Sequence, residues 1–122
     1  MKKWLNSASH AWDGIIVFFK TERNARIEGI AALLALGLAA WLHISFVEWC
    51  LVLFCIGGVL SAEAFNSAIE RLADLHTREH HPEIGKIKDI AAGAVLILAI
   101  ISLGVGIIIF GPKLIPVVSS IN

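Results

Sequence analysis

The sequence predicts an all-α integral membrane protein with three transmembrane helices and an amphipathic surface helix at its N-terminus. Of its 122 residues, 57% are hydrophobic, and the mean hydropathy is +0.80. A soluble chain this short would leave much of that apolar surface in water, because small domains bury a limited share of their area. The charged residues gather in residues 1–28 and 63–89, which leaves long tracts almost without charge. We therefore expect a single membrane domain over residues 1–122.

The charge balance argues against a nucleic-acid partner. Lysine and arginine together number 10, aspartate and glutamate also number 10, and the formal net charge is zero. Binding to nucleic acid rests on a strong basic field. The sequence offers no such field, so we expect no nucleic acid among the partners.

Residues 1–20 are expected to form the surface helix. Their apolar side chains recur at helical spacing, while the lysines, Asn6 and Asp13 lie elsewhere around the helix. Such a helix lies in the plane of the cytoplasmic membrane interface, with its tryptophans at headgroup depth. A secretory signal peptide is the alternative, but Asp13 interrupts any apolar core and no small-residue cleavage site follows. The apolar positions are Trp4, Leu5, Ala8, Ala11, Trp12, Ile15, Ile16 and Phe19.

Three apolar tracts supply the transmembrane helices, at residues 29–46, 49–62 and 90–111. A span needs about 20 residues to cross roughly 30 Å of hydrocarbon. The second tract reaches this length only by continuing past Glu63, which puts a carboxylate at the membrane boundary. The third tract carries no charge and is expected to end at Gly111-Pro112. The helices that contain the spans are predicted over about residues 28–46, 48–74 and 86–111.

The placement of lysine and arginine predicts the orientation in the membrane. Nine of the ten lie either in the N-terminal segment or between the second and third spans. Positively charged residues favour the cytoplasmic side. The N-terminus and residues 66–89 are therefore expected in the cytoplasm, with the first turn and the C-terminus outside.

A polar stripe follows the second apolar tract. At about 100° per residue, its five members fall on one face of a helix that runs directly out of a span. Carboxylates at that depth are costly and usually face a cavity or a partner. The alternative is a helix end that emerges into water, and this suffices for the last member. The stripe consists of Glu63, Asn66, Ser67, Glu70 and Asp74.

Two further polar segments flank the other spans at the same membrane face, over residues 21–28 and 86–93. If the helices pack together, we expect Glu22, Glu70, Lys88 and Asp89 to converge. Carboxylates with a lysine suit a nucleotide bound with Mg²⁺, because Mg²⁺ prefers few protein carboxylates with several phosphate oxygens, and lysine supplies a point charge to phosphate.

These segments resemble the prokaryotic diacylglycerol kinase family. Glu63-Ala-Phe-Asn-Ser-Ala-Ile-Glu70 is similar to the family signature E-x-x-N-[ST]-A-I-E. Lys88-Asp89-Ile-Ala-Ala-Gly-Ala-Val-Leu resembles the family's second characteristic stretch, and residues 21–28 resemble the polar segment before its first span. The resemblance implies a homotrimer in the bacterial inner membrane, with active sites between subunits at the cytoplasmic face. It also implies phosphorylation of a membrane lipid hydroxyl by ATP with Mg²⁺.

The resemblance further implies roles for individual residues. Glu63 would be the base that receives the proton of the lipid hydroxyl, and Asn66 would position the acceptor or the base. Glu22 and Glu70 would hold Mg²⁺ on ATP. Nucleotide contacts are expected from Glu22, Glu70, Glu79, His80, His81, Lys88 and Asp89, and from Lys3 and His10, which replace an arginine and a tyrosine of the family's best-known form. Lipid contacts are expected from Glu28, Glu63 and Ala92.

Several functional readings remain open at this point. The main one is phosphorylation of diacylglycerol to phosphatidic acid, which Glu28-Gly29 favours. An undecaprenol kinase of the same family is the alternative, favoured by Glu22-Arg23-Asn24 and by Ala91-Ala92-Gly93. A small proton-coupled exporter and a structural membrane subunit are more distant, because neither needs a long polar connection between spans. His76, His80 and His81 also have a spacing that can bind zinc on a helix.

Overall fold

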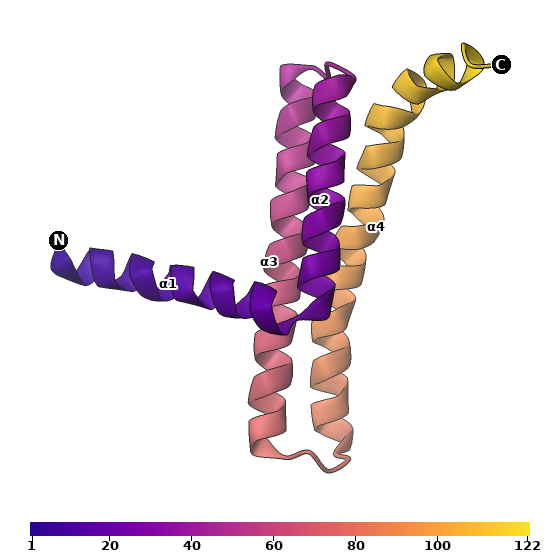
Figure 1. Cartoon of the computed structure of the whole chain (residues 1–122). Coiled ribbons are helices and arrows are strands. Elements are labelled where there is room, and N and C mark those ends of the chain that lie inside the picture. The colour runs from indigo at the N-terminus through magenta and orange to yellow at the C-terminus, as the bar shows by residue number, and fades with distance from the viewer.

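The computed structural model describes all 122 residues and consists of four helices (Figure 1). They are α1 (Lys2–Thr21), α2 (Arg23–Trp41), α3 (Phe46–His76) and α4 (Pro82–Ser119). α2, α3 and α4 lie side by side, and α1 projects sideways from the start of α2. The last three helices are long and apolar enough to cross a membrane. The predicted all-α membrane fold is therefore confirmed.

The α1–α2 junction sets the direction of the surface helix. Glu22 separates the two helices in an extended conformation, with φ −102° and ψ 117°. The Arg26 guanidinium donates to the carbonyl oxygens of Phe19 and Lys20 at 3.0 and 2.9 Å, which satisfies the open end of α1. A Cβ atom at Gly29 would lie 3.3 Å from the Phe19 ring, so the missing side chain lets α1 approach α2 closely.

α3 begins at a capping box and extends beyond the membrane. The Glu48 amide donates to Ser45 Oγ at 3.2 Å, and the Ser45 amide donates to Glu48 Oε1 at 3.0 Å. The 31 residues of α3 span about 46 Å, which exceeds the roughly 30 Å of hydrocarbon. Figure 1 accordingly shows α3 and α4 continuing past the level of α1.

The helices are longer than their apolar tracts. α2 runs from Arg23 to Trp41, whereas the sequence predicted about 28–46. It ends earlier than predicted because His43, in the following turn, adopts a left-handed φ of 52°. α4 begins at Pro82, four residues before the predicted start at 86, because the fixed φ of proline suits the first turn of a helix. The expected end at residue 111 is wrong, since α4 runs to Ser119 through Pro112 and Pro116. Proline removes one backbone bond and bends a helix without ending it, and Figure 1 shows the end of α4 turning away from the bundle.

Packing within the chain buries little of the apolar surface. α3 packs against α4 and α2 packs against α3. A small apolar cluster of Ala39, Ile44, Val52 and Ile109 holds together the end far from α1. Only 9 of the 122 residues are buried, which leaves most leucines, isoleucines and valines for contact with lipid or with other subunits.

Candidate active site

The site begins with three buried polar residues on adjacent turns of α3. Glu63, Asn66 and Ser67 are 6%, 8% and 6% exposed, and they make up one third of all buried residues. Burying polar groups is unfavourable without hydrogen-bond partners. The Asn66 side-chain oxygen nevertheless has no partner in the chain. Such a group is available to a ligand or to another subunit.

Carboxylates from three elements surround Glu63. Glu22, at the α1–α2 junction, and Glu70, two turns further along α3, lie close enough for their charges to repel that of Glu63. Glu28 on α2 is also in electrostatic range of Glu63. The Asn24 side chain lies against the Glu63 carboxyl. The structure thus places Glu22 and Glu70 each in electrostatic range of Glu63. The predicted convergence of Glu22 and Glu70 on one nucleotide stays a prediction.

Two cations link these elements across the helices. Arg71 on α3 donates to Glu22 Oε1 at 3.0 Å and also contacts the Thr21 hydroxyl. Lys88 on α4 donates to Asp74 Oδ1 at 2.7 Å. Asp74 lies in the part of α3 that extends beyond the membrane, and its hydrogen bond from Lys88 holds the pKa of its carboxyl below the ordinary value. Lys88 therefore pairs with Asp74, whereas the sequence predicted convergence with Glu22 and Glu70.

Other predicted site residues occupy the α3–α4 loop and α4. Glu79, His80, His81 and Lys88 help to line a hollow of about 310 Å³. Nδ1 of His81 accepts from the Glu83 amide at 3.2 Å and so caps α4. Asp89 and Ala92 are exposed on the surface of α4. The loop and the carboxylate cluster therefore lie at the same end of the α3–α4 pair, the end that extends past the level of α1 (Figure 1).

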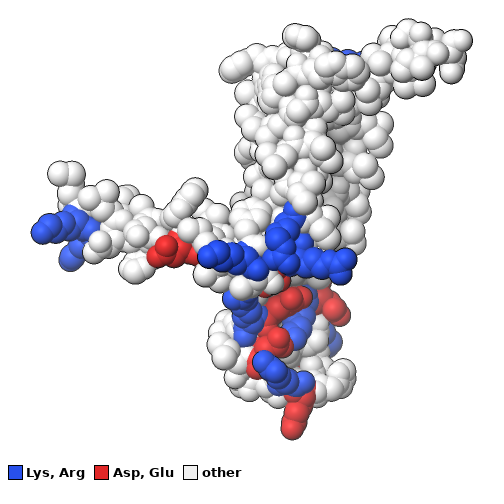
Figure 2. All heavy atoms as spheres, in the orientation of Figure 1, with Lys and Arg blue, Asp and Glu red and all other residues white.

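The outer part of α1 does not reach this cluster within one chain. Lys3 and His10 are exposed on the arm that points away from the bundle (Figure 1). Figure 2 shows charged side chains along α1 and at the lower end of the bundle, with a broad uncharged surface above them. A site that uses Lys3 or His10 therefore needs α1 of another subunit.

No group of three or more His, Cys, Asp or Glu side chains is arranged to hold a metal ion. His76, His80 and His81, whose spacing alone can bind zinc on a helix, do not form such a group, and Pro82 follows them at the start of α4. Mg²⁺ makes a different demand, since it is bound by one or two carboxylates together with substrate phosphates and water. Glu22 and Glu70 are carboxylates of the right kind for this role.

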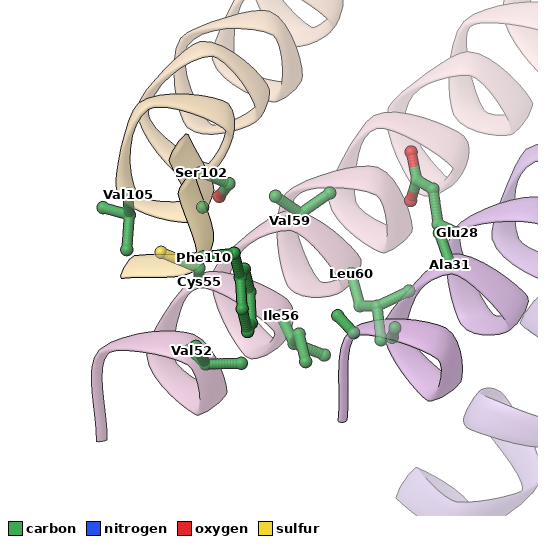
Figure 3. A pocket seen from close by; sticks show the side chains of 13 residues that line it. Glu28, Ala31, Val52, Cys55, Ile56, Val59, Leu60, Ser102, Val105 and Phe110 are labelled. Carbon is green, nitrogen blue, oxygen red and sulfur yellow. The ribbon is translucent and has the colours of Figure 1, made fainter. Parts of the chain in front are cut away.

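An apolar groove runs from the carboxylate cluster along the spans. It has a volume of about 220 Å³ and is formed by α2, α3 and α4. Figure 3 shows Phe110 and aliphatic side chains gathered between the helices, with Glu28 at one edge. Glu28 is the one charged residue of the lining, and neither its Oε2 nor Ser102 Oγ has a hydrogen-bond partner.

Sequence reasoning missed two of these features. The sequence motif over residues 63–74 contains Arg71 but indicates no role for it, because its pairing with Glu22 depends on contacts between helices. Ser102 is the single hydroxyl residue in the tract 90–111. That isolation in an otherwise apolar span was a signal that could have identified it.

Three apolar helices with a cluster of polar side chains toward one end of the bundle define a small helical membrane protein. The family described as prokaryotic diacylglycerol kinase matches residues 9–110. Undecaprenol kinase of Bacillus subtilis (strain 168) is 40% identical over 114 residues, which cover 93% of each chain. Diacylglycerol kinase of Escherichia coli (strain K12) is 34% identical over 98 residues, which cover 80% of each chain. The chain belongs to the prokaryotic diacylglycerol kinase family and is a lipid kinase.

Proposed function

We propose that this chain transfers the γ-phosphate of ATP to a membrane lipid hydroxyl at the cytoplasmic face, with Mg²⁺ bound to the nucleotide. The observation that carries the proposal is the burial of Glu63 beside Asn66, with Glu22 and Glu70 in electrostatic range. A second observation supports it, because the apolar groove starts at Glu28, which is itself close to Glu63. A lipid with its chain in this groove presents its hydroxyl at the level of the carboxylates.

Glu63 is the general base in this proposal. It takes the proton of the lipid hydroxyl as the new oxygen–phosphorus bond forms, and the bond to the leaving β-phosphate oxygen breaks to release ADP. Asn66 orients the hydroxyl or the Glu63 carboxylate, and its unpartnered oxygen supports that role. Phosphoryl transfer needs little covalent help from the protein, so alignment of these groups supplies much of the rate.

Glu22 and Glu70 are assigned to Mg²⁺. The bound ion neutralises phosphate charge, which is the main electrostatic requirement of phosphoryl transfer. Mg²⁺ is commonly bound by one or two carboxylates together with phosphate oxygens and water, and Glu22 and Glu70 would supply the two carboxylates. The repulsion among Glu22, Glu63 and Glu70 is relieved when a divalent cation is present.

The nucleotide lies beside the cytoplasmic extension of α3 and α4 in this proposal. Glu79, His80, His81 and Lys88 line the hollow of the α3–α4 loop, and Asp89 follows on α4. Lys3 and His10 reach the nucleotide from the α1 arm of a neighbouring subunit. A homotrimer provides that arm and also covers part of the exposed apolar surface. The N-terminus and the site then face the cytoplasm of a bacterium.

Undecaprenol and diacylglycerol are the two candidate acceptors. The resemblance of single motifs left both open, with diacylglycerol as the first expectation. The greater identity and coverage of the match to an undecaprenol kinase favours undecaprenol. The apolar lining of the groove suits a hydrocarbon chain, which either lipid supplies. We therefore take undecaprenol as the preferred acceptor and diacylglycerol as the second.

Side-by-side phosphorylation of the two lipids tests this proposal. The purified protein, with ATP labelled on the γ-phosphate and Mg²⁺, receives undecaprenol or a short-chain diacylglycerol in detergent micelles, and chromatography identifies the labelled product. We expect label on both lipids, with a higher kcat/KM for undecaprenol. The matched control replaces Glu63 with Gln. Absence of label on both lipids would contradict the proposed function, and a higher kcat/KM for diacylglycerol would reverse the order of acceptors.

A further inference from the structure

We propose that Arg71 is a positioning residue that holds Glu22 ready to bind Mg²⁺. The inference rests on the proposed function, which assigns Glu22 to the metal. Glu22 lies in an extended junction between two helices, so neither helix fixes its side chain. The observed restraint comes from α3, where Arg71 Nη2 donates to Glu22 Oε1 at 3.0 Å.

The charges around Glu22 explain why it needs this partner. Glu22 repels Glu63, and Glu70 adds a further negative charge to the same cluster. Without a cation, this repulsion pushes Glu22 out of the cluster toward water. Two other basic side chains are engaged elsewhere, because Arg26 binds carbonyl oxygens at the end of α1 and Lys88 pairs with Asp74. Arg71 is the single cation in contact with Glu22.

The geometry of the contact leaves Glu22 free to bind a metal. An arginine can grip a carboxylate with two nitrogens, but here a single nitrogen, Nη2, reaches a single oxygen of Glu22. The same nitrogen also contacts the Thr21 hydroxyl, which donates in turn to the Val17 carbonyl at 2.7 Å. Arg71 thereby ties the end of α1 to α3 while Oε2 of Glu22 remains available.

This arrangement resembles the outer shell of a metal site, where a second residue orients the ligand. Loss of such a partner typically lowers metal affinity by about 10–100-fold. Arg71 also follows Glu70 directly in the chain, so α3 presents both one proposed ligand and the residue that orients the other. The position explains how two ligands from separate elements come to act on one ion.

The test measures Mn²⁺ binding with a non-hydrolysable ATP analogue by electron paramagnetic resonance, on the full-length protein in detergent. We expect Arg71→Gln to raise the Mn²⁺ dissociation constant about 10-fold or more. Arg71→Lys should recover part of the affinity because it keeps the charge. The apparent KM for Mg²⁺ should rise in parallel in Arg71→Gln, while kcat at saturating Mg²⁺ changes little. Lys86→Gln, which breaks the exposed Lys86–Glu83 pair at 3.3 Å, is the matched control and should leave both constants unchanged.

A double-mutant cycle separates this inference from the function on which it rests. If Arg71 acts through Glu22, the variant with both Arg71→Gln and Glu22→Gln binds Mn²⁺ no more weakly than Glu22→Gln alone. Unchanged Mn²⁺ affinity in Glu22→Gln would overturn the metal assignment and the inference together. Weakened affinity in Glu22→Gln with unchanged affinity in Arg71→Gln would overturn the inference alone. Additive losses in the double variant would likewise contradict it.

Discussion

Glu63 is the residue at which the apolar and polar halves of α3 meet. It is buried although it carries an acidic group, and it lies against Asn24 with Asn66 one turn away. Intramembrane ionisable residues are uncommon and usually face the interior or a functional partner. Burial of a carboxyl group between a groove for lipid and a cluster of carboxylates suits a base that acts on a hydroxyl at the interface.

Replacement of Glu63 tests that role. Glu63→Gln preserves size and most hydrogen bonding but cannot accept a proton, so we expect kcat to fall by about 10²–10⁴-fold. Glu63→Asp keeps the carboxylate but shifts it, and displacements of that size cost up to about 10²-fold. Lipid phosphorylation in micelles gives kcat, and size-exclusion chromatography checks assembly.

Glu83→Gln is the matched control for the Glu63 variants. Asp74, the last member of the polar stripe, is less suitable. Glu83 is exposed and pairs with Lys86 at the surface, whereas Asp74 binds Lys88, which we assign to the nucleotide. Near-normal turnover of an assembled Glu63→Gln protein would remove Glu63 as the base.

At the scale of single residues, the sequence predicts the polar face of α3 better than it predicts which side chains pair. The stripe from Glu63 to Asp74 follows from helical spacing, and the structure buries its first members. The pairs Arg71–Glu22 and Lys88–Asp74 could not be deduced. They depend on how far α3 is rotated and shifted along its neighbours, and one sequence without its packing does not fix either quantity.

At the scale of helices, apolar length predicts the spans but not the helix ends. The three spans appear as helices of 19, 31 and 38 residues. Each helix has ends set by local chemistry, such as the capping box at Ser45 and the proline at the first turn of α4. The length of an apolar tract reflects the thickness of the hydrocarbon core. It therefore does not predict helical turns that continue beyond the core into water.

The order of these helices makes the topology testable. Both free cysteines, Cys50 and Cys55, are first replaced by alanine. Single cysteines are then placed at Ser45, Thr77 or Ser119, and intact cells are treated with a membrane-impermeant maleimide. We expect labelling at Ser45 and Ser119, because the positively charged segments favour the cytoplasm. Thr77 should be labelled after permeabilisation alone, and strong labelling of Thr77 in intact cells would reverse the orientation.

At the scale of the whole molecule, charged side chains are distributed unequally between the two ends of the helix bundle. Figure 2 shows charged side chains along α1 and at the end of the bundle that carries the α3–α4 loop. The carboxylates around Glu63 belong to this charged part of the chain. At the opposite end, one ion pair joins Glu48 of α3 to Lys113 of α4, with Lys113 Nζ 2.8 Å from Glu48 Oε2. That pair has no net charge, and the helix bend at Pro112 lies next to it.

The length of α3 between Glu48 and Glu63 determines how the protein fits bilayers of different thickness. Fifteen residues of α3 separate them, or about 22 Å, which is shorter than the roughly 30 Å of a typical hydrocarbon core. The bilayer must thin, or one end must enter it. The neutral Glu48–Lys113 end enters the bilayer at lower free energy than the charged end. We therefore expect this end to absorb the mismatch, which keeps the carboxylates around Glu63 at the membrane surface.

Turnover in vesicles of graded lipid length measures this effect. Wild-type protein should keep most of its turnover from short-chain to long-chain phosphatidylcholine. Lys113→Gln leaves Glu48 charged and unpaired, so its turnover should fall more steeply as the bilayer thickens, with little difference in thin bilayers. An equal dependence on thickness in both proteins would contradict the idea. The expected result would mean that the Glu48–Lys113 pair, remote from Glu63, keeps the proposed active site at a constant depth in membranes of different composition.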